Sequence, residues 1–367
     1  MNFKIAQNIL NVNELLVYIN SVFFKKESIY ENFEVSNLKQ LPRRTIQGLL
    51  YKLLSPNIGQ VYKSIDLIYS FTSTINFSVD SLCSLQDFQF VYGSKPSFDN
   101  NLKKIVYDDK GIYDLRTSER IINIVCTRTS SYFYNNENVL ILIDNKSKFS
   151  AYTLPSAQPL WQFSLAGLGT YRYHNNETRA VEVSQFIGVY DHVLWVFLSP
   201  GWILGLDIIT GEQKQLLKGV PRDQLIGTID EYLEETDLLR FVDTHYVLDH
   251  ATGIIHGLIY DKHYQIDVSS EVPSNTIWGM QAAFKEIGIG PGSIDRRFAL
   301  FEGKIYFAAY EQGRFGILNT TAKTIDYVSE QFTEQWLKDI QVNEQNVYVL
   351  DENGTLFIFE KEENKET

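Results

Sequence analysis

The sequence predicts an all-β fold, because short apolar runs alternate with turn residues along most of its 367 residues. The runs are only a few residues long, so they suit strands better than helices. Aromatic residues make up 14% of the chain, and aromatic side chains favour strands. The pattern is clearest in four consecutive runs with tight turns between them, which we expect to form one antiparallel sheet: 185–191, 193–198, 202–209 and 212–217.

This four-stranded unit recurs along the chain, and a period of roughly 40–55 residues is typical of a β-propeller. We expect further copies over 138–163, 239–266 and 297–328. The N-terminal third is less regular, and its runs with the same rhythm are 15–19, 65–69 and 111–115.

The last copy has two strong runs, 346–350 and 355–359, and no fourth strand of its own. Segment 2–6 is expected to supply that strand and to close the last blade, which would protect the sheet edges. The chain length divided by the period predicts a propeller of seven blades, or alternatively eight, each made of four antiparallel strands. We expect a single domain over 1–362, followed by a charged tail over 363–367.

The segment 206–212, Leu-Asp-Ile-Ile-Thr-Gly-Glu, resembles the turn of propellers with PQQ-like or WD40-like repeats. A second copy lies at 248–253 and a degraded third at 318–322, while 159–163 looks like the outer strand of the same repeat. In such a turn, Asp accepts hydrogen bonds from the following backbone and Gly takes a positive φ. The resemblance implies a propeller fold. Quinone-dependent dehydrogenases of this family carry adjacent cysteines near the cofactor, whereas non-enzymatic members act as assembly scaffolds and binding modules.

Composition excludes several classes of protein. The chain has 33 Lys and Arg against 45 Asp and Glu, a net charge of −12, which excludes a protein that coats nucleic acid. Hydrophobic residues at 44% exclude a disordered chain. Cys83 and Cys126 are not adjacent, so we expect buried free thiols and no quinone cofactor. We expect no signal peptide, no membrane helix and a cytoplasmic location.

Three clusters of residues are candidates for chemical sites. Four of the six histidines, His245, His250, His256 and His263, lie close in sequence, but their spacing matches no metal-ligand motif, so no metal is expected. The glycine-rich segment 286–293 lacks the lysine of a phosphate-binding loop. The acidic segment 230–237 resembles a solvated loop more than a pair of catalytic carboxylates. No catalytic motif was found, and we expect no enzyme activity.

Strand order predicts where a binding site would lie. If the strands of each blade run A, B, C, D with alternating direction, the B–C and D–A connections emerge at one end of the sheets. The turns at 210–211 and 252–253 are expected to be C–D connections, and the long segments 165–184, 219–237 and 270–296 to be D–A connections. Long loops are usually retained for function. The predicted partner-binding residues on this end are Tyr171, Arg172, Tyr173, His174, Trp202, Asp230, Glu231, Tyr232, Glu234, Glu235, Trp278, Met280, Arg296 and Arg297.

The leading hypothesis is a non-enzymatic propeller, monomeric on its own, that binds a basic protein through this end. One concrete form is a bacterial immunity protein that caps and neutralises a cognate toxin. The alternatives are a carbohydrate-active hydrolase or lyase, and a ligand-binding module, each using the central channel. An enzyme would show paired carboxylates with perturbed pKa values in that channel.

Overall fold

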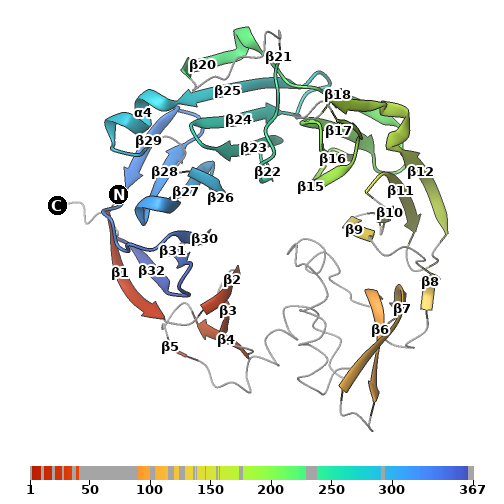
Figure 1. Cartoon of the computed structure of the whole chain (residues 1–367), viewed down its shortest axis with the longest axis horizontal. Helices are drawn as coiled ribbons and strands as arrows, with labels where there is room; N and C mark the ends of the chain where they lie inside the picture. Colours follow the sequence, from red (N-terminus) through yellow and green to blue (C-terminus); the bar gives the residue numbers. More distant parts are fainter. Residues whose placement is uncertain are drawn as a thin grey trace. The chain divides into compact units, whose positions relative to one another are not determined.

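The computed structural model describes most of the chain after residue 128 and separate strands before it (Figure 1). The described residues are 2–9, 12–18, 21–26, 29–34, 39–40, 90–99, 104–114, 120–123, 129–134, 137, 139–144, 146–153, 156, 158–172, 177–228, 238–290 and 294–362. The predictions for 65–69, Cys83, Cys126 and the tail 363–367 lie outside them. Two compact units are present: the first comprises Met1–Arg43, Gly201–Ile203 and Leu217–Thr367, and the second comprises Arg44–Pro200 and Leu204–Leu216.

The first unit is built mainly from antiparallel sheets in which most neighbouring strands follow one another in sequence. One sheet has the order β2-β3-β4-β5: Val12–Tyr18, Ser21–Lys26, Ile29–Glu34 and Lys39–Gln40. The next contains β22 to β25: Tyr246–Asp249, Ile254–Ile259, Lys262–Asp267 and Ser274–Met280. A further sheet contains β26 to β29: Ile294–Phe301, Lys304–Ala309, Arg314–Asn319 and Thr324–Val328.

The two ends of the described chain share one sheet. This sheet has the order β30-β31-β32-β1: Leu337–Val342, Asn346–Asp351, Leu356–Glu362 and Asn2–Ile9. Strand β1 runs antiparallel to β32, with Ile5 opposite Phe359. The N-terminal strand therefore occupies the fourth position of the last sheet, where the sequence placed it.

The second unit contains strands of the same kind. Strands β6 to β8 are Phe90–Asp99, Lys104–Asp114 and Arg120–Asn123, and β9 to β12 are Thr129–Tyr134, Val139–Asp144, Lys148–Thr153 and Pro159–Ser164. A short pair follows, β13 and β14: Thr170–Arg172 and Thr178–Ala180. The four runs predicted over 185–217 form one sheet, β15 to β18: Val183–Tyr190, Val193–Leu198, Trp202–Asp207 and Gln213–Leu217. Within this sheet, Trp202, Ile203 and Leu217 belong to the first unit.

The copy predicted over 239–266 is displaced by one strand. Its first strand is β22, which begins at Tyr246, and its fourth is β25, which was predicted as part of a long connection. The earlier run contributes instead to a short pair outside the sheet, β19 (Val220–Pro221) with β21 (Leu238–Leu239). Strand β20 (Leu225–Thr228) adds in parallel to β25. Strand β25 was not predicted because it begins with polar residues. In the correct register, the turn at 252–253 joins strands A and B rather than C and D.

The sheet β26–β29 of the first unit is buried on both of its faces. One core lies between β22–β25 and β26–β29 and includes Leu258, Trp278 and Phe307. The next lies between β26–β29 and β30–β32, where Phe315 packs within 4.9 Å of Phe359 between ring centroids. Burial on both faces explains why the strands are continuous apolar runs rather than alternating ones.

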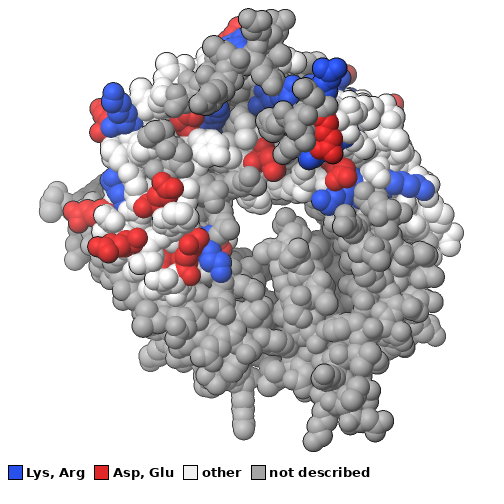
Figure 2. All heavy atoms as spheres, in the orientation of Figure 1, with Lys and Arg blue, Asp and Glu red and all other residues white. Residues whose placement is uncertain are grey.

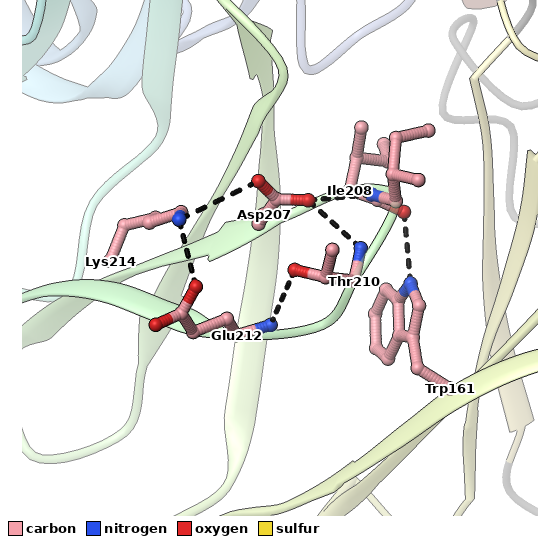
Figure 3. A network of polar contacts seen from close by, with 7 residues as sticks. Trp161, Asp207, Ile208, Thr210, Glu212 and Lys214 are labelled. Atoms are coloured by element: carbon pink, nitrogen blue, oxygen red, sulfur yellow. Dashed lines mark hydrogen bonds and ion pairs between the residues drawn. The ribbon is translucent and has the colours of Figure 1, made fainter.

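The turns that suggested the repeat have the expected hydrogen bonds (Figure 3). Asp207 Oδ1 accepts from the backbone N–H groups of Ile209 at 3.0 Å and Thr210 at 2.8 Å, and Gly211 has a φ of 72°. Although burial raises it, these hydrogen bonds, together with Lys214, hold the pKa of Asp207 below its usual value. Asn319 repeats the pattern by accepting from the N–H groups two and three residues later.

Trp161 of β12 packs against the Asp207 turn and donates a hydrogen bond to it (Figure 3). The buried indole Nε1 donates to the carbonyl of Ile208 at 2.9 Å, and a Cβ placed on Gly211 would lie 2.5 Å from the Trp161 ring. In the Asn319 turn the same left-handed position holds Lys323, with a φ of 56°. The Lys323 ammonium donates to Gln265 of the neighbouring sheet. A lysine thus makes the contact between sheets at a turn where glycine is the expected residue.

Candidate partner-binding surface

Backbone hydrogen bonds in the first unit join the B–C turns to the D–A connections. The N–H of Tyr260, in the B–C turn between β23 and β24, donates to Ile294 at the start of β26. Met280, at the end of β25, donates to Asp261 in that same turn. The two kinds of connection therefore meet at one end of the sheet, as strand order predicts.

The next sheet repeats this arrangement. In its B–C turn, η4 (Tyr310–Gln312) leads into β28, and Gln312 Nε2 donates to Gly288 in the preceding D–A connection at 3.0 Å. Arg314 Nε donates to the carbonyl of Ser329 in the following connection at 2.8 Å. In the last sheet, the N–H of Glu352 in the B–C turn donates to Trp336 at 2.8 Å. We call this end of the first unit the connector face.

The opposite end gathers the A–B and C–D turns. The N–H of Val268, in a C–D connection, donates to Gly253 in an A–B turn, and Thr320 Oγ1 donates to Gly303 at 2.7 Å. Val272 lies in a C–D connection and is 79% exposed. We call this end the turn face.

Exposed aromatic side chains lie on the connector face. Trp336, directly before β30, and Tyr260, in a B–C turn, are each 51% exposed. The ring of half-buried Tyr310 meets that of Trp336 edge to face, with 5.6 Å between centroids. The hydroxyl of Tyr310 donates to Glu311 at 3.0 Å. The Trp336 ring is therefore supported on one side by the protein and open on another.

Exposed carboxylates lie in the same connections as this aromatic pair. Glu311, Glu330, Glu334 and Glu352 are exposed, and all lie in B–C turns or in the D–A connection that ends at Trp336. Figure 2 shows acidic side chains over the part of the first unit where Figure 1 labels β27 to β31. This end of the unit is suited to a positively charged partner.

A shallow cavity of about 530 Å³ opens beside the pair. All its lining residues are polar: Glu311, Gln312, Arg314, Glu330 and Gln331. Arg314 is fixed, because its guanidinium donates to the carbonyls of both Ser329 and Ile287. The two carboxylates and one guanidinium of the lining give a net charge of −1 (−2 + 1).

Two of the predicted partner-binding residues lie in the core. Trp278 is 7% exposed and Met280 is fully buried, because both belong to β25 and face the neighbouring sheet. Their assignment to an exposed connection was wrong, and it followed from the displaced strand register. Trp202 begins β17 and is half-buried, with the ammonium of Lys218 at 4.8 Å from its ring centroid.

The other predicted residues stay untested. Tyr171 and Arg172 lie in β13 of the second unit, and Arg172 is exposed. Arg296 and Arg297 lie in β26. Residues outside the described ranges are Tyr173, His174, Asp230, Glu231, Tyr232, Glu234 and Glu235. Sequence reasoning missed Tyr260, Tyr310 and Trp336. The B–C rule would have found Tyr260 with the correct register, and it would have found Tyr310 with the register that was predicted.

Two of the clustered histidines form a buried pair. His256 Nδ1 lies 3.0 Å from His263 Nε2, and the two rings stack with an interplanar angle of 6°. Burial lowers the pKa of His256 to about 4 and holds the pKa of His263 well below its usual value. Within the described residues, no group of three or more His, Cys, Asp or Glu side chains is placed to hold a metal ion.

No helix in the described ranges is long and apolar enough to cross a membrane. No family model matches the sequence, and no curated protein matches it. Among solved structures, the chain is similar to the β-propeller domain of Cps50 (Swd1) from Myceliophteria thermophila. That similarity has a TM-score of 0.51 at 8% identity and covers 98% of this chain and 100% of that one.

Two further propellers show weaker similarity. Sqt1 of Saccharomyces cerevisiae has a TM-score of 0.41 at 11% identity, covering 73% of this chain and 66% of that one. BamB of Moraxella catarrhalis has a TM-score of 0.36 at 13% identity, covering 69% and 79%. At such low identity the similarity to Cps50 indicates a shared fold and does not indicate a shared function. The chain has an all-β, propeller-like fold.

Proposed function

We propose that this chain is a non-enzymatic propeller that binds a basic protein through the connector face of its first unit. The observation that carries the proposal is the Tyr310–Trp336 pair, whose indole is half exposed among carboxylates. Propeller folds are commonly protein-binding scaffolds, which agrees with this role.

The physical argument combines packing and charge. A large aromatic side chain exposed to water gains free energy when a partner covers it, and Trp and Tyr are enriched among the residues that dominate binding. Surrounding carboxylates attract a basic partner and orient it during the encounter. Among the described residues, Glu330, Glu334 and Glu352 form no ion pair that would neutralise this attraction.

Site-specific photo-crosslinking tests the proposal in the cell that makes the protein. Benzoylphenylalanine replaces Trp336 on the connector face in one variant and Val272 on the turn face in the control variant. The expected result is a discrete adduct only at position 336, with a crosslinked partner peptide rich in Lys and Arg. Adducts at position 272 alone, or an acidic crosslinked peptide, would reject this surface.

The finer parts of the proposal concern architecture and role. We infer a ring of seven blades in which β1 closes the last, and a cytoplasmic protein that is monomeric until it meets its partner. One form of such a binder is an immunity protein that caps a bacterial toxin. In that case, co-expression of this chain with the captured partner rescues growth that the partner alone arrests. Unrescued growth arrest, or a harmless partner, would exclude the immunity role.

A further inference from the structure

The connector face offers two adjacent places for positive charge. One is the open side of the Trp336 ring, and the other is the cavity between Glu311 and Glu330. Tyr310 links them, because its ring packs on Trp336 while its hydroxyl binds the carboxylate of Glu311. A segment of partner chain that contacts one place is therefore close to the other.

We propose that these two places bind a short arginine-bearing segment of the partner, with one guanidinium stacked on Trp336 and a second basic side chain in the cavity. This inference rests on the proposed function and names the chemistry that the same surface recognises. It requires a rigid aromatic face, nearby carboxylates and a polar pocket, and each is present among the described residues.

The exposed indole favours a cation over an apolar group. A guanidinium over the face of Trp gains cation–π attraction, and Trp is the strongest aromatic partner for a cation. The chain itself contains this arrangement, since Lys218 lies over Trp202 and Lys361 lies 4.6 Å from the ring centroid of Phe301. Among the described residues, no Lys or Arg covers the ring of Trp336.

The cavity favours a hydrogen-bond donor with positive charge. Its lining offers the carboxylates of Glu311 and Glu330, and its one cation, Arg314, is held against the backbone by two carbonyls. Every lining residue carries a polar or charged group that can form a hydrogen bond with an occupant. Two amides, Gln312 and Gln331, add hydrogen-bonding capacity.

Arginine fits both places better than lysine. Its planar guanidinium stacks on an aromatic face and carries five N–H donors in a fork that matches a carboxylate, whereas a lysine ammonium is a compact and strongly hydrated charge. We therefore expect selectivity for arginine at equal peptide charge, beyond what the net charge of the protein gives.

Calorimetric titration of the full chain with tetra-arginine peptide at low salt tests the inference. Tetra-lysine, tetra-citrulline and tetra-glutamate peptides of equal length serve as comparisons. We expect tetra-arginine to bind several-fold more tightly than tetra-lysine, and the other two not to bind. Trp336→Ala is expected to weaken tetra-arginine binding about tenfold. Glu311→Gln is expected to weaken it several-fold, and Trp336→Phe less than Trp336→Ala.

Val272→Ala on the turn face is the matched control and should leave binding unchanged. Equal affinity of Trp336→Ala and the parent chain, or equal affinity for arginine and lysine peptides, would overturn the inference. If Trp336→Ala fails to fold, as judged by its thermal unfolding, Trp336→Phe and Glu311→Gln still decide. A crosslink at position 336 to a partner peptide without arginine would refute the recognition of arginine but not the proposed function. Crosslinks confined to position 272 would refute the proposed function itself.

Discussion

Acidification should destabilise the folded chain through the buried His256–His263 pair. At neutral pH one ring donates to the other across 3.0 Å, which requires the nitrogen of the accepting imidazole to carry no hydrogen. When both are protonated, each nitrogen of this contact carries a hydrogen and no acceptor remains. Lys323, bound to the adjacent Gln265, adds a positive charge nearby and further disfavours protonation.

The size of the effect follows from the pKa of His256, which burial lowers from 6.5 to about 4. A folded-state pKa below the unfolded value means that the unfolded chain binds more protons in this range. The stability is complete above pH 6.5 and is lost as the pH falls toward 4. The difference amounts to about 3 kcal/mol in full, of which about 2–3 kcal/mol is lost by pH 4.5. The pKa of His263 is lowered in the same direction by burial, so its contribution to the pH dependence has the same sign.

Urea unfolding between pH 7.5 and 4.5 measures the change. The control is the double variant His256→Leu/His263→Phe, which removes both partners together and leaves no unpaired nitrogen. Asp207 and Asp326 have lowered pKa values, so their own contributions are lost only at still lower pH. We expect the parent chain to lose about 2–3 kcal/mol more than the double variant over this range. Parallel pH dependence in the two proteins would refute the reasoning.

Two packing predictions follow from close contacts. Trp161→Phe removes the donor to the buried carbonyl of Ile208 and should lower the free energy of unfolding by about 1–3 kcal/mol. Urea unfolding measures this change, and an unchanged midpoint would contradict a stabilising role for this hydrogen bond. Gly313→Ala places a Cβ 1.9 Å from the carbonyl oxygen of Thr333, at a φ of 57°, so the B–C turn must move. We expect a lower thermal midpoint and weaker tetra-arginine binding, whereas Gly303→Ala, which meets no atom within 4 Å, should leave binding intact.

Local patterns in the sequence were sufficient to predict strands and turns. The runs over 185–217 became β15 to β18, because each is bounded by residues that favour turns. Asp207 and Asn319 signalled their turns through side chains that bond to the following backbone. These signals act over a few residues, so a single sequence reveals them.

The site was harder to predict because it depends on strand register. Strand β25 begins with polar Ser274 and ends with apolar Met280, so its run looked like a loop, and Trp278 was placed on the surface. Trp336 is held in place by contacts with Tyr310 and Glu352, which lie in other turns of the chain. No local pattern reports such contacts. The rule that B–C and D–A connections share one end was correct for the first unit, whereas two of the residues assigned to that end, Trp278 and Met280, lie in the core.

The central claim is tested most directly by measuring the dissociation constant of the complex with the crosslinked partner. This constant is compared between two double variants that remove the same number of charges. Glu311→Gln/Glu352→Gln removes two carboxylates from the connector face, and Glu302→Gln/Glu344→Gln removes two from the exposed A–B turns of the turn face. The account predicts slower association and weaker binding only for the first variant, together with a smaller effect of added salt. Equal losses in both variants, or a loss confined to the second, would contradict it.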